Sequence, residues 1–266
     1  MSEMHVYRFG PGMTDGKADM KNLLGGKGAN LAEMALLEIP VPPGCTITTE
    51  VCTFFNENGK TYPKELEQQL KNALKDVEKS VGAIFGDQKN PLLLSVRSGA
   101  RASMPGMMET VLNVGLNDFT RNGLIEQSGD ARFVFDAQRR LIQMYSDVVM
   151  EKASGIEPEE GMGIRNQLEH ELEKMKEQVG VTEDTDLSAT NLEDLVEIYK
   201  GKVLEVLKKP FPEDPWEQLW GAISAVFHSW DGKRAKAYRK IENIPEEWGT
   251  AVNVQAMVYG NLGDDS

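Results

Sequence analysis

A glycine-rich segment near the amino terminus holds one basic side chain where a phosphate could approach. In NLLGGKGANLAEM, residues 22–34, Lys27 lies between Gly26 and Gly28, just before an apolar helical pattern. Glycine lets a ligand come close to the main chain, and the first turn of a helix directs amide N–H groups at an anion. The segment does not satisfy the Walker A pattern. Taken alone, it is compatible with a flexible turn carrying a solvated lysine or with a phosphate-binding loop.

A second basic side chain follows an apolar run that is typical of a buried strand. The run is LLLSV, residues 92–96, and Arg97 comes directly after it, beside small residues. A guanidinium keeps its charge and matches phosphate oxygens with a planar fork of donors. Because α/β folds often place ligand contacts at strand ends, the sequence predicts that Arg97 binds an anion. Arg101, four residues on, is interpreted as a solvated surface charge.

The loop after this arginine pairs a rigid residue with a permissive one. Pro105 and Gly106 are adjacent, and Met107, Met108 and Thr110 follow. This pairing favours a shaped loop over a flexible one. The methionines offer an adaptable apolar surface to a nucleotide base; filling a gap in the core is their alternative role.

The hydrophobic periodicity predicts the elements that position these side chains. HVYRF (5–9) and CTITT (45–49) have strand character. Apolar residues at helical spacing predict a helix over 64–85, with Gly86 placed to end it. Strands that alternate with helices favour an α/β layered architecture.

The rest of the chain is predicted to be mainly helical until its last strand. Amphipathic spacing predicts helices over 132–151, 168–179, 184–207 and 215–230, with Thr190 or Asn191 as a cap of the third. Alternation over 250–259 predicts a half-buried strand. Gln255 falls on its more polar face, and residues 260–266 suggest a hairpin-like turn.

The composition limits the function. The chain has 266 residues, 40% of them hydrophobic, and a formal net charge of −13. This charge argues against nucleic-acid binding, and any phosphate site must supply its own cations and backbone donors. No apolar run approaches the roughly 20 residues of a membrane span, and no secretory signal is visible. Two cysteines without a CxxC pair predict a reducing, cytoplasmic location.

Four ordered segments together resemble a known family. Residues 22–34, 39–50, 95–118 and 249–261 closely resemble the N-terminal nucleotide-binding part of pyruvate phosphate dikinases, and the resemblance covers essentially the whole chain. RSGARASMPGMMETVLN is the most specific piece. The resemblance implies an α/β (α+β) fold of the ATP-grasp type, with the nucleotide held between two α/β subdomains.

The resemblance also implies a division into domains. The first ATP-grasp subdomain is expected at 2–115, completed by about 205–248, and a helical subdomain is expected at 116–204. Residues 249–266 are expected to begin a second ATP-grasp subdomain that is truncated. The acidic metal-binding residues, the phosphohistidine domain and the pyruvate domain are expected to be missing, so no metal ligand is assigned.

Roles in the site follow from the same resemblance, position by position. Lys27 is expected to contact the phosphates of ATP, and Arg97 to do likewise and to be needed for phosphoryl transfer. Gly106 and Thr110 are expected to lie against the phosphates, and Gln255 near the adenine pocket. The implied cofactors are ATP and Mg²⁺.

The reaction implied is that of a phosphotransferase: ATP, pyruvate and inorganic phosphate give AMP, phosphoenolpyruvate and diphosphate. In the family the β-phosphate goes to a histidine on a swivelling domain and the γ-phosphate to inorganic phosphate, and full-length members are expected to be homo-oligomers. This chain alone is expected not to make phosphoenolpyruvate.

Two alternative functions stay open. The chain could be a stand-alone nucleotide-binding or regulatory protein, or a non-catalytic helical interaction module. His5, His170 and His228 are expected to be structural or solvated.

Overall fold

The computed structural model describes residues 4–259, and the chain clusters into two compact units. Unit 1 comprises Met1–Phe85, Leu92–Thr110 and Ile223–Val258, and unit 2 comprises Gly86–Pro91, Val111–Ala222 and Tyr259–Ser266. The division into ATP-grasp and helical subdomains stays a prediction. The hairpin-like turn predicted at 260–266 lies outside the described residues.

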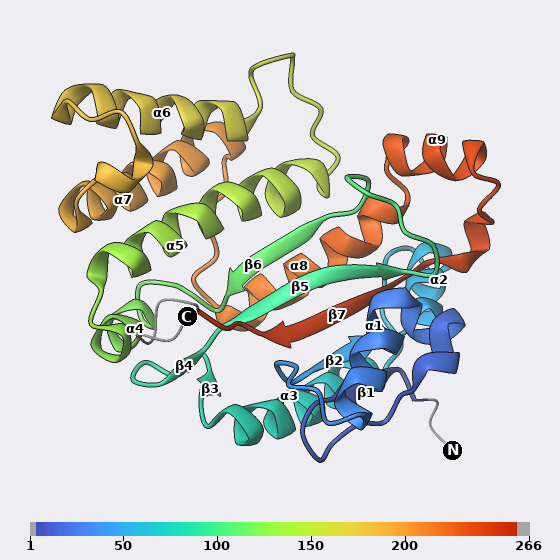
Figure 1. Ribbon diagram of the computed structural model, residues 1–266. Helices are drawn as coiled ribbons and strands as arrows, with labels where there is room; N and C mark the ends of the chain where they lie inside the picture. Colours follow the sequence, from blue (N-terminus) through green and yellow to red (C-terminus); the bar gives the residue numbers. More distant parts are fainter. Residues whose placement is uncertain (1–3, 260–266) are drawn as a thin grey trace. The chain divides into compact units, whose positions relative to one another are not determined.

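Unit 1 is built on an antiparallel sheet (Figure 1). In spatial order its strands are β1 (Val6–Phe9), β2 (Gly44–Ile47), β7 (Thr250–Ala256) and β5 (Leu94–Ala100). Two short strands, β3 (Ile84–Phe85) and β4 (Pro91–Leu92), precede β5, and β6 (Thr110–Val114) begins at the last residue of the second segment of unit 1. The strands predicted near the amino terminus are confirmed.

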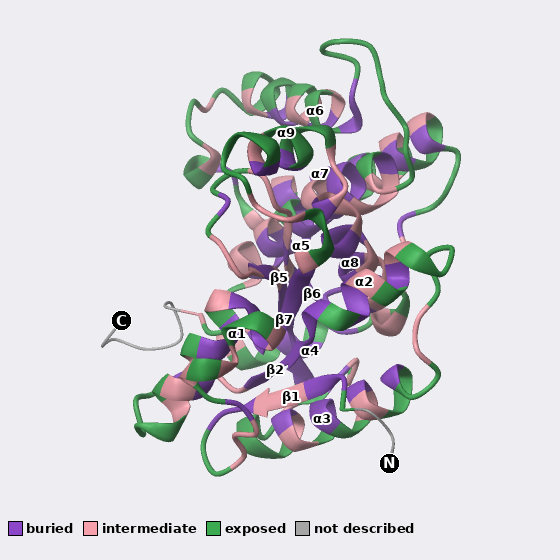
Figure 2. Cartoon of the chain, turned by 90° about the vertical axis from the view of Figure 1, so that its right-hand side faces the viewer, coloured by how far each residue is buried: buried purple, intermediate pink, exposed green. Residues whose placement is uncertain are grey.

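Two predictions about the strands are wrong. Arg97 does not follow its strand but lies inside β5, because the small residues after it continue to pair with β7 as far as Ala100. β7 is not half-buried; all seven of its residues are buried. It has strand neighbours on both sides, and Figure 2 shows it in the buried colour. Alternation along the sequence reveals the two faces of a strand but not whether both are covered.

The register separates the sheet into a polar face and an apolar face. Thr46, Asn253 and Arg97 are directly opposed across β2, β7 and β5, so their side chains lie on the same face. Gln255, two residues along β7, shares that face, as the sequence predicts. We call these four residues the polar face. The opposite face is apolar and includes Cys45, Ile47, Leu94, Val96, Val252 and Val254.

Helices cover both faces of this sheet. α1 (Lys21–Leu36) lies on the polar face, where Gly28 approaches Thr46 and Asn253. α3 (Leu66–Val81) lies on the other face, where Asp76 pairs with Arg8 at 2.6 Å. The remaining helices of unit 1 are α2 (Thr49–Glu57), α9 (Lys233–Ile241) and the second half of α8 (Pro215–Trp230). The mixed α/β class predicted from the sequence is confirmed.

The end of α3 differs from the prediction. The helix stops at Val81, and Gly82 is its C-cap with a φ of 78°. Gly82 therefore ends the helix rather than Gly86, because a residue without a Cβ adopts the left-handed conformation of a C-cap at little cost.

Unit 2 is mainly helical. It contains α4 (Arg121–Ser128), α5 (Ala131–Tyr145), α6 (Ile164–Val179), α7 (Ala189–Leu207) and the first half of α8. The helix predicted over 132–151 is confirmed, although its final part, Ser146–Lys152, is a π-helix. Ser188, not Thr190 or Asn191, caps α7, because its hydroxyl accepts from the Asn191 amide while the Asn191 side chain bonds back. Among the described residues, no helix combines the length and apolarity needed to cross a bilayer.

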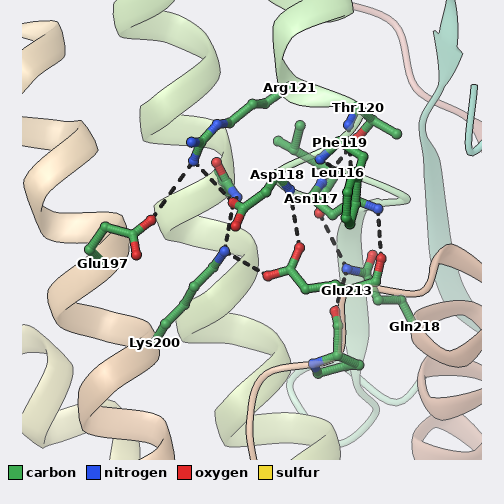
Figure 3. Close-up of polar contacts among 12 residues, drawn as sticks. Leu116, Asn117, Asp118, Phe119, Thr120, Arg121, Glu197, Lys200, Glu213 and Gln218 are labelled. Atoms are coloured by element: carbon green, nitrogen blue, oxygen red, sulfur yellow. Dashed lines mark hydrogen bonds and ion pairs between the residues drawn. The ribbon is translucent and has the colours of Figure 1, made fainter. Parts of the chain in front are cut away.

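A cluster of paired charges stabilises unit 2 (Figure 3). Asp118 Oδ1 accepts hydrogen bonds from Arg121, Gln138 and Lys200, at 3.0, 3.0 and 2.6 Å. Lys200 also pairs with Glu213 at 2.6 Å, and Glu213 accepts from the Asp118 amide at 3.1 Å. We call these five residues the Asp118 cluster. It joins the segment before α4 to α5, α7 and the segment before α8.

Candidate nucleotide-binding site

The glycine-rich segment forms a break in α1 that rests on β5. Gly25 has a φ of 67° and a ψ of 172°, so the helix is interrupted there. A Cβ at this position would lie 1.5 Å from the Gly99 carbonyl oxygen. Only glycine therefore fits, both for its conformation and for its contact. The residues after the break begin a new first turn, as the sequence predicts for the segment around Lys27.

Gly28 brings the same turn onto the polar face. A Cβ there would lie 2.8 Å from both the Cγ2 and the Oγ1 of Thr46 and 3.0 Å from Asn253 Oδ1. Gly25 and Gly28 thus dock the turn on three neighbouring strands, and Lys27 between them is exposed. In the part of the chain that the structure describes, the Lys27 side chain has no hydrogen bond or ion pair, so the packing of the two glycines positions the turn that carries it.

Arg97 reaches the same neighbourhood from β5. It is half-buried and stands opposite Asn253 in the register. Its Nε is buried without a hydrogen-bond partner. Within residues 4–259, neither Lys27 nor Arg97 forms an ion pair, although the chain has 42 acidic residues. Buried donors are normally paired, so an unpaired guanidinium beside a glycine-rich turn is suited to an anionic ligand.

Arg101 is a basic residue whose environment the sequence did not reveal. Its guanidinium carbon lies 5.4 Å from the centre of the Trp248 ring, and its Nε is buried without a partner. Its carbonyl oxygen would be 4.0 Å from a Cβ on Gly26. Burial lowers the pKa of Arg101. The interpretation of Arg101 as a solvated charge is therefore wrong, because the side chain packs on an aromatic ring beside the turn of Lys27.

The loop predicted to be shaped by Pro105 and Gly106 forms a tight turn. The Met107 amide donates to the Met104 carbonyl at 3.2 Å, and Gly106 has a φ of 72°. This arrangement, with proline followed by a glycine of positive φ, is typical of a type II turn. Gly106 is exposed, and no atom lies within 4 Å of a Cβ built there. The turn is shaped, and a side chain at Gly106 would point into open space.

The other two predicted site residues lie on strands. Thr110 is half-buried at the start of β6. Among the described residues, no hydrogen bond or ion pair joins Thr110 or Gly106 to Lys27. Gln255 is buried on the polar face, and its Nε2 donates to the Pro42 carbonyl at 2.9 Å. The structure thus brings together the turn of Lys27, Arg97 and the strand of Gln255, but not the loop tip.

Asn253 and Thr46 were not singled out from the sequence. Thr46 Oγ1 donates to Asn253 Oδ1 at 2.8 Å, and both residues are buried. Asparagine is depleted in strands, so a buried asparagine flanked by two valines is the signal that would have identified it. Its partner is 207 residues away in the sequence, and no local pattern links the two.

The two cysteines and His228 are packed among other side chains of unit 1. Cys45 and Cys52 are buried, and burial raises the pKa of each thiol to about 12. Burial lowers the pKa of His228, which packs edge-on against Phe55. In the described part of the chain, no group of three or more histidine, cysteine or acidic side chains could hold a metal ion.

Comparison with known proteins identifies the family. A family model described as "Pyruvate phosphate dikinase, AMP/ATP-binding domain" matches residues 21–78 and 59–263. Pyruvate, phosphate dikinase of Rhizobium meliloti (strain 1021) is 52% identical over 98% of this chain, and that of Clostridium symbiosum is 49% identical over 98%. Pyruvate, phosphate dikinase 1, chloroplastic, of Arabidopsis thaliana is 50% identical over all of it.

This chain spans 28% of the length of the two bacterial relatives and 26% of the plant one. The family-model match covers both compact units and includes Lys27, Arg97 and the strand of Gln255. The chain therefore belongs to the AMP/ATP-binding domain family of pyruvate phosphate dikinase.

Proposed function

We propose that this chain binds ATP with its phosphates between Lys27 and Arg97, as the phosphoryl-donating part of a pyruvate phosphate dikinase. The observation that supports this proposal most strongly is an unpartnered guanidinium atom on the face of the sheet where the turn of an exposed lysine packs. Arg97 has a buried Nε without a partner, and Lys27 lies exposed on a turn docked beside it. In an acidic protein such cations are suited to a polyanion, because charge-assisted hydrogen bonds replace the missing partners.

The backbone contributes to the proposed phosphate site as well. The break at Gly25 interrupts the helical ladder, and the first amides after such a break have no carbonyl four residues earlier in helical position. Donors of this kind favour phosphate oxygens. We place the phosphates over this turn, with Thr110 and the tip at Gly106 moving against them on binding.

Gln255 is proposed to lie near the adenine. Its Nε2 is engaged by Pro42, which leaves the Oε1 to accept a hydrogen bond. An amide oxygen can accept from an exocyclic amino group such as that of adenine. This placement puts the base along β7, on the same face as the phosphates.

The whole reaction is a further part of the proposal. ATP, pyruvate and inorganic phosphate would give AMP, phosphoenolpyruvate and diphosphate through a phosphohistidine on another domain. Phosphoryl transfer depends on positioning and on neutralising phosphate charge, which are the contributions that Lys27 and Arg97 offer. We also propose the ATP-grasp fold, with the antiparallel sheet of unit 1 as part of one subdomain.

Magnesium is proposed to enter with the nucleotide. The described residues contain no group of three or more histidine, cysteine or acidic side chains that could hold a metal ion. Mg²⁺ usually keeps several waters and binds one or two carboxylates together with substrate phosphates, so in this proposal the ATP phosphates supply its ligands and the ion would neutralise part of their charge.

Titration calorimetry with a non-hydrolysable ATP analogue tests the proposed site. We expect Lys27→Ala and Arg97→Ala each to weaken binding by about ten- to a hundred-fold, because a hydrogen bond to a charged group contributes about 1.5–3 kcal/mol. Lys75→Ala is the matched control, since Lys75 is exposed on α3 across the sheet. Equal affinity for wild type and both site variants would reject the site.

A further inference from the structure

We propose that Asn253, held in place by Thr46, is a positioning residue that sets the spacing between Lys27 and Arg97. The inference rests on the proposed function, in which these two cations bind the nucleotide phosphates. Asn253 itself is buried and is not expected to touch the ligand. It acts through the backbone segments that pack against its amide.

One end of the Asn253 side chain is anchored. Its Oδ1 accepts a hydrogen bond of 2.8 Å from Thr46 Oγ1, and both residues are buried, 2% and 1% exposed. The two stand directly opposite each other across β7 and β2. A buried hydrogen bond between directly opposed residues restricts the rotation of the amide, so the amide plane has a defined orientation on the polar face.

The anchored amide lies between two glycines of different elements. A Cβ on Gly28 of α1 would be 3.0 Å from its Oδ1, and a Cβ on Gly99 of β5 would be 2.6 Å from its Nδ2. Both glycines therefore pack directly on this one side chain. Gly28 adjoins Lys27, and Gly99 is two residues from Arg97, which is itself the register partner of Asn253.

An asparagine at position 253 lowers the stability of the fold, and packing in the sheet alone would not select it. Asn253 Nδ2 is buried without a hydrogen-bond partner among the described residues, which is unfavourable. The two neighbours of Asn253 along β7 are valines, and a β-branched residue suits a buried strand better than asparagine does. What the amide provides is a rigid polar spacer of defined width beneath the turn of Lys27.

This spacer matters because phosphate binding by two cations depends on their separation. When the side chains that bind a ligand are misplaced by about 1 Å, much of their contribution to binding or catalysis can be lost. If the amide is removed, the turn of α1 can settle toward the sheet while Arg97 stays on β5. The two cations then no longer match the spacing of the phosphate oxygens.

Variants of the 266-residue chain test the inference with the same ATP analogue. Asn253→Ala removes the spacer, and Thr46→Val removes the anchoring hydroxyl while keeping the volume. Thr46→Ser is the conservative variant, because serine keeps the hydroxyl that donates to Asn253. Ser98→Ala is the control, because Ser98 is buried on the apolar face of β5. Urea unfolding of each protein separates loss of fold from loss of binding.

We expect Asn253→Ala and Thr46→Val each to weaken binding of the ATP analogue by about ten-fold, which lies within the usual range of coupling between residues in contact. Thr46→Ser and Ser98→Ala should bind as wild type. In a Lys27→Ala background, Asn253→Ala should weaken binding less than about two-fold, because its effect passes through the missing lysine. A purely structural role would not produce this dependence on Lys27.

The outcomes separate the inference from the proposed function. If Lys27→Ala weakens binding but Asn253→Ala and Thr46→Val only lower the unfolding midpoint, the positioning role is wrong and the phosphate site stands. An equal loss for Asn253→Ala with and without Lys27 also overturns it. If Lys27→Ala and Arg97→Ala bind as wild type, the proposed function itself fails.

Discussion

The Asp118 cluster of unit 2 and the polar face of unit 1 both contain arginine and amide side chains, but they differ in whether the arginine is paired with an acid. In the cluster, Asp118 and Glu213 surround Lys200, and Arg121 bonds to the same carboxylate (Figure 3). On the polar face, the Nε of Arg97 is buried without a partner. In the cluster each cation therefore faces a carboxylate, although Gln138 Oε1 is buried without a partner, whereas Arg97 has no carboxylate partner among the described residues.

We interpret the cluster as structural and propose that the polar face belongs to a binding site. A network of paired charges stabilises the elements that it joins, here the segment before α4 with α5 and α7. A buried guanidinium atom without a partner reduces stability, and we propose that Arg97 is retained because it binds a ligand. Substitutions should therefore affect stability in one region and nucleotide affinity in the other.

The largest loss of stability and of binding is expected for Gly25→Ala, because this substitution disturbs the turn that carries Lys27. The new Cβ would lie 1.5 Å from the Gly99 carbonyl oxygen at a φ of 67°. The unfolding free energy should fall by at least about 3 kcal/mol, and binding of the ATP analogue should be lost. Urea unfolding and calorimetry measure the two effects.

The control for this variant is Gly82→Ala. Gly82 has a similar φ of 78°, but no atom lies within 4 Å of its Cβ position. Gly82→Ala should lower the unfolding free energy by only about 1 kcal/mol and leave the affinity for the ATP analogue unchanged. Equal losses for the two glycines would show that the contact with Gly99 is unimportant.

Asp118→Ala should break the charge pairs of the Asp118 cluster and leave the affinity for the ATP analogue unchanged. It removes the acceptor of Lys200, Gln138 and Arg121. We expect a loss of about 2 kcal/mol in unfolding free energy, a figure reduced because the Asp118 side chain is 39% exposed. Glu193→Ala, an exposed acid on α7, is the control. Weakened ATP binding in Asp118→Ala would contradict the separation.

The same carboxylate makes the stability of unit 2 dependent on pH. Burial favours the neutral acid, but hydrogen bonds from Lys200 and Gln138 outweigh it and lower the pKa of Asp118 below its ordinary 3.8. A carboxyl whose folded pKa is depressed contributes stability above the unfolded pKa and loses it as pH falls through the folded value. The unfolding free energies of wild type and Asp118→Asn should therefore differ at pH 6, and the difference should shrink as the pH falls below the ordinary pKa of 3.8. A difference that stays constant to pH 2.5 would contradict the assignment.

The smallest stability effect is expected for Arg97→Met, with the opposite sign. Methionine keeps the bulk of the side chain and removes an unpaired buried donor, so the unfolding free energy should stay unchanged or rise by about 0.5–1 kcal/mol. Affinity for the ATP analogue should nevertheless be lost. A destabilisation as large as that of Asp118→Ala would show that Arg97 has a structural role.

The elements that depend on local pattern were predictable from the sequence. α3 and α8 follow from apolar residues at helical spacing, and the turn beside Lys27 from its adjacent glycines, although α1 already begins at Lys21 and is kinked at Gly25. The cap of α7 was misplaced by two or three residues, since several residues near it could serve as a cap.

The features that depend on distant partners were not predictable. The central place of β7 is decided by β2 and β5, which lie far earlier in the chain. For the same reason the contact of Asn253 with Thr46 and the packing of Arg101 on Trp248 had no local signature. In the candidate site, the sequence indicated which cations to examine, and the fold showed which of them share one face of the sheet.

Protection of Lys27 from amine acetylation tests the central claim most directly. Lys27 and Lys75 are both exposed, so both should react at similar rates in the free protein, as followed by mass spectrometry. The ATP analogue should slow the reaction of Lys27 by about ten-fold, as expected for an ammonium bound to phosphate, and should leave Lys75 unchanged. Adenosine, which lacks phosphates, should protect neither, and Arg97→Met should abolish the protection. Equal reaction of Lys27 with and without the saturating analogue would contradict the proposal that its ammonium and Arg97 together bind the phosphates of ATP.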